Sequence, residues 1–201
     1  MCFFKNRNNE QQQKPFYDDV MDKKNKSPNG KFMITCSDFC KSSGSGGFRD
    51  SGDGQFILYE NGINVLQGEL QRPNHGKVSN NGTFIINDSM FGEGLKSTFY
   101  AFDRQGKIIQ KRYFKANLLN NGISQDGGFA VCQTCNSDND DANTLNLFDL
   151  LTANQLWQIR PETGWADSYE FDTANGFLYV VHKDLGKFRY NFQGEFLDRD
   201  I

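Results

Sequence analysis

Short apolar runs alternate with turn residues along the chain, and four of these runs repeat one pattern of polar and hydrophobic positions. Each begins with Ser or Thr, reaches Gly three residues later, and continues into a stretch rich in Phe, Ile, Leu or Val, at 27–37, 79–89, 124–134 and 173–183. The glycine supplies the positive φ angle that a tight turn requires, and the residues after it favour strands. The pattern predicts four equivalent hairpins, anchored at Phe32, Phe84, Phe129 and Leu178.

A second hairpin is predicted after each of these. Its signature is an aromatic residue followed by an acid or amide and a turn, at 59–62, 102–106, 148–149 and 190–194. Short apolar runs leave these turns ("INVLQGEL", "KIIQKRYF", "QLWQIR", "EFLD"), and others precede the first hairpins ("GKVS", "NGIS", "SYEF"). The four anchors are 52, 45 and 49 residues apart. The chain therefore contains four units of about four strands each.

Four-stranded units at this spacing resemble the blades of β-propellers, the superfamily that includes the tryptophan–aspartate (WD) repeat proteins. The resemblance covers residues 25–198 and implies an all-β fold of antiparallel four-stranded blades, about four in number. The Gly-His and Trp-Asp signatures of the WD class are absent, so no specific family is indicated. A closed four-bladed ring, an arc completed by self-association and a fragment are all compatible with four blades. A twisted β-sandwich of the same hairpins is the alternative fold.

The repeat domain is predicted over 25–201, and residues 1–24 form a polar N-terminal segment. Phe16, Val20 and Met21 would lie on one face of a short helix against the sheet, and a frayed tether is the other interpretation. No stretch approaches the ~20 apolar residues of a membrane span, and no cleavable signal pattern opens the chain. We therefore expect a cytoplasmic protein whose five cysteines are thiols.

Charge is distributed unevenly along the chain. The net charge is −3, but residues 136–201 carry 12 acidic and 5 basic side chains. An acidic surface repels phosphates, so we expect no nucleic acid partner there, and a basic protein partner is compatible with it.

The cysteines raise the question of a metal or redox site. Cys132 and Cys135 form a CxxC pair at the end of the second strand of repeat 3, and Cys36 and Cys40 occupy the matching place in repeat 1. Together with His182 they form a candidate zinc set. Repeats 1 and 3 would stand about 15 Å apart across a four-bladed ring, so the loops would have to cross its axis. No helix follows to activate a dithiol. Reduced thiols and no cofactor are the leading expectation, with zinc as the alternative.

Two other polar groups carry weaker signals. Asn136, Asp138 and Asp140 alternate as in a calcium loop, but the turn glycine and the final glutamate are missing, so a solvated loop is favoured over calcium. His75, Asn120 and Asn121 precede the repeats together with Asp167, near the axis of a propeller. They suggest a metal-dependent hydrolase similar to the lactonase-like propellers as an alternative function. No Ser/His/Asp, Cys/His or paired-carboxylate spacing points to a catalytic group.

Equivalent loops are predicted on one face, because every repeat enters with the same polarity. These loops span 37–55, 89–96 and 134–143, and connections at 70–76, 114–122 and 160–168 join them. The leading interpretation is a non-catalytic protein-binding module, compatible with an antitoxin or immunity-type inhibitor of a basic toxin. The predicted apolar anchors are Phe48, Phe91, Trp165 and Tyr169. The acids predicted to steer a basic partner are Asp138, Asp140, Asp141, Asp167 and Glu170. A second copy completing the ring is a further possible partner.

Overall fold

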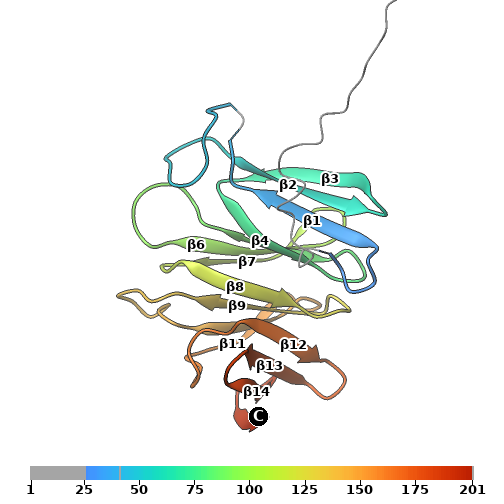
Figure 1. The fold of residues 1–201 in the computed structure, drawn as a ribbon, viewed down its shortest axis with the longest axis vertical. Helices are drawn as coiled ribbons and strands as arrows, with labels where there is room; N and C mark the ends of the chain where they lie inside the picture. The colour runs from blue at the N-terminus through green and yellow to red at the C-terminus, as the bar shows by residue number, and fades with distance from the viewer. Residues whose placement is uncertain (1–25, 41, 201) are drawn as a thin grey trace, which may run out of the picture.

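The computed structural model describes residues 26–40 and 42–200, which form fifteen strands in four antiparallel sheets (Figure 1). Sheet 1 contains β1 (Phe32–Ser37), β2 (Gly54–Glu60) and β3 (Ile63–Leu70). Sheet 2 contains β4 (Pro73–Val78), β5 (Phe84–Asp88), β6 (Ser97–Phe102) and β7 (Ile108–Phe114). Sheet 3 contains β8 (Leu118–Ile123), β9 (Phe129–Thr134), β10 (Leu145–Asp149) and β11 (Asn154–Ile159). Sheet 4 contains β12 (Ser168–Asp172), β13 (Phe177–His182), β14 (Gly186–Asn191) and β15 (Phe196–Asp200).

The predicted all-β repeat is confirmed. The four repeated segments contain β1, β5, β9 and β13, and the predicted second hairpins form the last turn of each sheet. Each sheet pairs its strands in chain order, which is the up-and-down order of a propeller blade. The two-sheet sandwich considered as an alternative is not formed. No part of the described chain is helical, so no helix long and apolar enough to cross a membrane is found there.

Over residues 26–40 and 42–200, the four sheets form an open stack and not a closed ring. Figure 1 shows sheet 1 at the top, sheet 4 at the bottom, and sheets 2 and 3 between them in chain order. Contacts join β1 with β4, β5 with β8, and β8 with β12, the strands of neighbouring sheets. Sheet 1 has three strands and the other sheets have four. At the place of the missing first strand, Lys26 forms an isolated β-bridge with Met33 of β1. The N-terminal segment with Phe16, Val20 and Met21 lies outside the described residues.

Apolar side chains fill the three spaces between neighbouring sheets. Phe56, Phe84 and Phe102 pack between sheets 1 and 2, with ring centroids 4.9 to 5.8 Å apart. Phe99 and Phe148 stack between sheets 2 and 3 at 4.9 Å. A third cluster fills the space between sheets 3 and 4. Because successive side chains of a strand point to opposite faces, a strand inside the stack must be apolar on both faces.

The end of the stack is visible in the burial of its strands. All residues of β5 are buried, whereas β13 alternates between buried and partly exposed positions. The outer face of sheet 4 carries two ion pairs, Lys187 with Glu170 and Arg189 with Asp198. The Arg189 guanidinium also lies 4.9 Å from the centroid of the Phe177 ring. The face of sheet 4 that no other described sheet covers is therefore polar.

The serine that begins the repeated turn makes two hydrogen bonds through its hydroxyl group. Ser124 is buried; its hydroxyl donates to Asp126 Oδ1 at 2.6 Å and accepts the Phe129 N–H at 2.9 Å. Ser27 makes the same two bonds, to Asn29 Oδ1 at 2.7 Å and from the Phe32 N–H at 2.9 Å. The hydroxyl thus ties the turn to the first residue of the strand that follows. The repeat signature therefore specifies a turn whose buried polar atoms are paired.

Turns of successive sheets are also bonded to one another. The Asn29 N–H donates to Asn80 Oδ1 and the Asn80 N–H donates to the Gln125 carbonyl, both at 2.8 Å. Thr173 Oγ1 donates to Asp126 Oδ2 at 3.2 Å. We call this side of the stack the turn face; it lies on the right in Figure 1. The bonds between turns hold all four sheets in one alignment.

We predict that Ser124→Ala lowers the free energy of unfolding by about 1–3 kcal/mol, because the Phe129 N–H loses its side-chain acceptor and Asp126 loses a donor. Urea unfolding with a common m-value measures this difference. Ser51→Ala, at an exposed loop position, is the control and should change stability by less than about 0.5 kcal/mol. Equal effects of the two substitutions would contradict a structural role for the serine.

Candidate functional site: the loop face

The longer loops gather on the side opposite the turns, on the left in Figure 1. We call this side the loop face, and its described residues are 38–40, 42–53, 71–72, 89–96, 115–117, 135–144, 160–167 and 183–185. Hydrogen bonds join neighbouring loops: Arg49 Nη2 donates to the Gln71 carbonyl at 3.0 Å, and Asn139 Nδ2 donates to the Lys115 carbonyl at 2.6 Å. The Ser89 N–H donates to the Arg72 carbonyl at 3.0 Å. The loops are therefore held as one surface.

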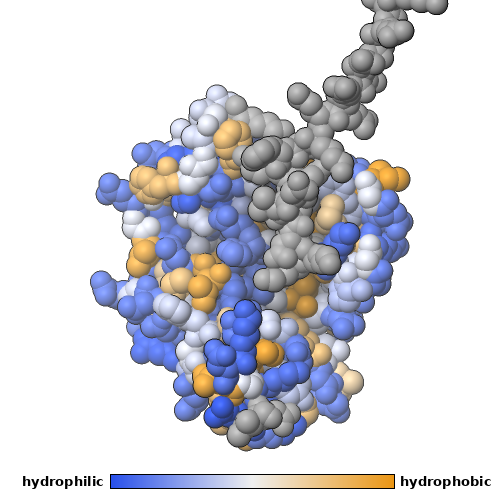
Figure 2. All heavy atoms as spheres, viewed as in Figure 1, coloured by the Kyte–Doolittle hydropathy of each residue, from blue (hydrophilic) through white to orange (hydrophobic). Residues whose placement is uncertain are grey.

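Large apolar side chains are exposed at several points of the loop face. Phe48 is 63% exposed and Trp165 is 50% exposed, as expected of contact anchors. Leu95 and Leu185 were not predicted, and they are exposed on two further loops. Figure 2, which shows the molecule from the side of Figure 1, has small separate hydrophobic groups within a mainly hydrophilic surface.

The other two predicted aromatic anchors are placed differently. Phe91 is partly buried, with the Arg49 guanidinium 5.6 Å from its ring centroid. Tyr169 lies on β12 in the contact between sheets 3 and 4, where its hydroxyl donates to Asn120 Oδ1 at 2.5 Å. Burial raises the pKa of Tyr169 well above its usual value. Tyr169 therefore stabilises the stack and does not lie on the loop face.

Acidic side chains predominate among the exposed charges of this face. Within its described residues the exposed acids are Asp50, Asp53, Glu93, Asp138, Asp140, Glu162, Asp167 and Asp184. The exposed bases there are Lys115, Arg160 and Lys183. Asp167 also organises the surface, since its Oδ2 accepts the Lys183 N–H at 2.8 Å. Glu170 lies on the outer face of sheet 4, paired with Lys187, and so lies apart from the other predicted acids.

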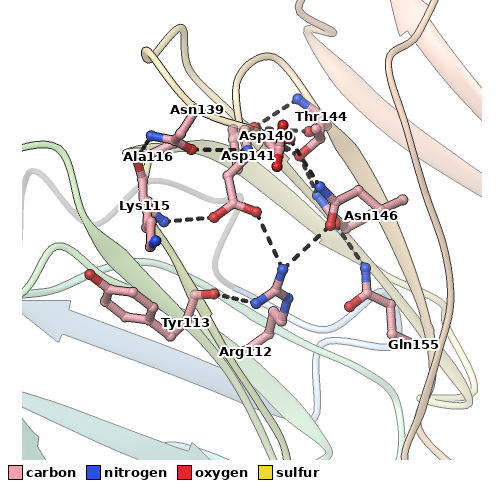
Figure 3. Close-up of polar contacts among 12 residues, drawn as sticks. Arg112, Tyr113, Lys115, Ala116, Asn139, Asp140, Asp141, Thr144, Asn146 and Gln155 are labelled. Atoms are coloured by element: carbon pink, nitrogen blue, oxygen red, sulfur yellow. Dashed lines mark hydrogen bonds and ion pairs between the residues drawn. The ribbon is translucent and has the colours of Figure 1, made fainter.

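Asp141 anchors the acidic loop and is not one of its exposed charges. Figure 3 shows the Asp141 carboxylate between Arg112, which lies on β7, and Lys115, which follows that strand. Oδ2 accepts the Lys115 N–H at 2.7 Å and Oδ1 accepts Arg112 Nη2 at 3.3 Å. The Asp141 N–H donates to Asn139 Oδ1 at 3.0 Å. These bonds attach a loop of sheet 3 to sheet 2 and leave Asp138 and Asp140 facing solvent.

The candidate zinc ligands do not form one site. Within residues 26–40 and 42–200, no group of three or more His, Cys, Asp or Glu side chains is arranged to hold a metal ion. Cys132 is buried in the core, and burial raises its pKa well above the usual value. His182 Nε2 lies 2.9 Å from Thr163 Oγ1. The same finding argues against a calcium site at Asn136, Asp138 and Asp140.

The remaining cysteines differ in their electrostatic setting. Burial raises the pKa of Cys36 to about 12, and burial also raises that of Cys135. Cys40 is the exception, because hydrogen bonds from Ser42 and Ser43 lower its pKa to about 7. No two of the four described cysteines form a disulfide. They are separate thiols in different environments.

The polar groups before the repeats are occupied by structural bonds. Asn121 Nδ2 donates to the His75 carbonyl at 2.6 Å and to Asn87 Oδ1 at 2.9 Å. Asn120 Nδ2 donates to the Ala166 carbonyl at 2.5 Å, and its oxygen accepts Tyr169. These amides join the first strands of neighbouring sheets. Among the described residues, His75 and Asp167 belong to no group of three or more His, Cys, Asp or Glu side chains that could hold a metal ion.

One feature was missed at the level of the sequence: a cleft of about 480 Å³ between sheets 1 and 2, open at the loop face. Its lining residues are Asp53, Glu69, Leu70, Gln71, Asp88, Met90, Thr98, Tyr100, Lys111 and Tyr113. Asp88 was the residue in the sequence that could have indicated this cleft. It occupies the same repeat position as Cys36, Gln133 and His182, and it is the only carboxylate among the four. The cleft depends on how the two sheets pack, which the repeat pattern does not specify.

Comparison with known proteins identifies the architecture and no family. No family model and no curated protein matches the sequence. The crystal structure of HIRA(644–1017) is similar, with a TM-score of 0.61 at 11% sequence identity over 86% of this chain and 53% of that chain. The chain thus spans about half the length of the HIRA chain. Because 407 chains of solved structures match, the arrangement is widespread, and the likeness shows the fold alone.

Proposed function

We propose that the chain is a β-propeller-type repeat protein that acts as a non-catalytic protein-binding module, with the loop face as its binding surface and a basic protein as its partner. The observation that supports this is the composition of the loop face: exposed Phe48, Leu95, Trp165 and Leu185 among eight exposed acids and three exposed bases. Large side chains of this kind supply most of the binding energy of protein interfaces. Acids around them attract a basic partner and raise the association rate.

Hydrogen bonding between the loops supports the same function. Binding by a mobile loop loses free energy when the loop becomes ordered, and a loop already held in place avoids that loss. Asp141 and Arg49 hold their loops through partly buried bonds to neighbouring chain segments, and Asn139 does so through an exposed bond. Exposed Asp138 and Asp140 are thereby presented from a fixed backbone. An immunity-type inhibitor that covers a basic toxin in the cytoplasm is the specific form we propose, on the basis of the acidity of the loop face.

The loop face is tested by matched substitutions on the two faces. A partner captured from the native cell is identified, purified and titrated against each variant. Trp165→Ala should weaken binding by about 2 kcal/mol, roughly 30-fold, and Leu151→Ala is its control, because Leu151 is 82% exposed on the turn face.

Asp138→Asn with Asp140→Asn should slow association in a salt-dependent manner. Gln105→Lys with Gln193→Lys on the turn face makes the same change in net charge and should leave association unchanged. Equal effects on both faces would disprove the assignment.

Anchoring of the acidic loop yields a separate prediction. Asp141→Ala should lower the free energy of unfolding by about 1–2 kcal/mol, because the Lys115 N–H loses its acceptor and Arg112 loses its ion-pair partner. Asp138→Ala and Asp140→Ala remove exposed carboxylates and should each change stability by less than about 0.5 kcal/mol. Urea unfolding measures all three variants. If the three losses are alike, Asp141 does not anchor the loop.

A further inference from the structure

The cleft between sheets 1 and 2 has an ionisable group at its base that the fold does not require. Asp88, at the end of β5, is 2% exposed and lines the cleft. Its Oδ1 accepts the Arg72 N–H at 2.7 Å and the Met90 N–H at 3.3 Å. A further backbone hydrogen bond to the carboxylate comes from Gln71. An asparagine oxygen would accept the Arg72 and Met90 bonds without burying a charge. Among the described residues no Lys or Arg forms an ion pair with Asp88, and burial, with Asp53 adding to it, raises its pKa.

The other repeats show what this position does when it is only structural. Gln133 of sheet 3 is fully buried; its Nε2 donates to the Gly164 carbonyl at 2.7 Å, and its Oε1 accepts the Ala166 N–H at 3.0 Å. His182 of sheet 4 makes one hydrogen bond, between its Nε2 and the Thr163 hydroxyl at 2.9 Å. Both are neutral groups that join the connection entering sheet 4. A buried carboxylate in sheet 2 costs more than such a group, because a charge loses its hydration on burial.

Aromatic rings and further acids complete the cleft. Cross-strand register brings Thr98 beside Asp88, Tyr113 beside Thr98, and Lys111 beside Tyr100. Lys111 Nζ lies 5.3 Å from the centroid of the Tyr100 ring, so the chain's own ammonium already occupies an aromatic face in this cleft. Asp53 and Glu69 are exposed residues that also line the cleft, contributed by sheet 1 and the loop before β2. The lining thus holds three carboxylates and one lysine.

We propose that this cleft receives a lysine or arginine side chain of the basic partner, with its cationic head beside Asp88 and its aliphatic stem against Tyr113 and Leu70. The proposal rests on the proposed function and names the group of the partner that enters the surface. A volume of about 480 Å³ is within the range of sites that enclose small ligands. The entering cation compensates the buried carboxylate, and Lys111 competes with it for the acidic end of the cleft.

The test uses the full-length protein and a hexalysine peptide as the probe, titrated by calorimetry at low salt. Asp88→Asn should weaken hexalysine binding about tenfold while the protein keeps its unfolding midpoint. Lys111→Gln should strengthen binding, because a competing cation is removed. Hexa(acetyl-lysine), which lacks the charges, should not bind. The control is Gln105→Lys at an exposed position on the turn face, which makes the same change in net charge as Asp88→Asn and should change hexalysine binding less than twofold.

Loss of the folded structure would weaken hexalysine binding in both variants. Weaker binding by Asp88→Asn together with stronger binding by Lys111→Gln therefore cannot result from unfolding. Equal weakening by Asp88→Asn and Gln105→Lys, or weakening by Lys111→Gln, would overturn the proposal. If the cleft variants leave hexalysine binding unchanged while the Trp165 and Asp138/Asp140 variants still weaken the captured partner, the cleft inference fails alone. If hexalysine responds as expected but the loop-face variants do not affect the partner, the proposed function fails instead.

Discussion

Face-to-face packing of the sheets is the constraint on which the rest of this structure depends. An inner strand such as β5 must be apolar on both of its faces, because a sheet lies on each side of it. That requirement explains why Phe predominates among the aromatic residues and why the clusters around Phe84, Phe99 and Leu147 each belong to two sheets. Polar chemistry is consequently displaced to the strand ends. Loops and turns there are free to differ, while the strands between them are not.

The fold was predictable because its signal is local. A turn glycine, a serine three residues before it and an apolar strand after it all lie within one repeated segment, so the sequence alone identified the hairpins of Phe32, Phe84 and Phe129. The pattern included the serine but did not reveal its role. Its hydroxyl donates to the side chain two residues later and accepts an N–H from the strand that follows. Local hydrogen bonding and apolar patterning agree in each repeat, and such agreement is typical of sequences that specify one fold.

The site was less predictable because its signals are long-range. Asp138, Asp140 and Asp141 are equivalent in the sequence, yet only Asp141 is buried, because Arg112 reaches it from a neighbouring sheet 29 residues away. Tyr169 was expected at the surface for a similar reason: its strand pattern does not reveal that Asn120 and Gln133 face it from sheet 3. Whether a polar side chain is buried in a hydrogen bond or exposed to solvent depends on the sheet that packs against it. A repeat pattern specifies that sheets stack, but it does not specify these pairings.

Internal repeats offer a comparison that a single sequence otherwise lacks. At the loop-face end of the second strand, the four sheets place Cys36, Asp88, Gln133 and His182 in equivalent positions. Gln133 and His182 use this position to bond an incoming connection, and the Cys36 thiol accepts a backbone hydrogen bond from Gly76. Three neutral groups therefore satisfy the same place in the fold. Asp88 is therefore the one carboxylate among four equivalent positions, and it is the group on which the proposed cation site depends.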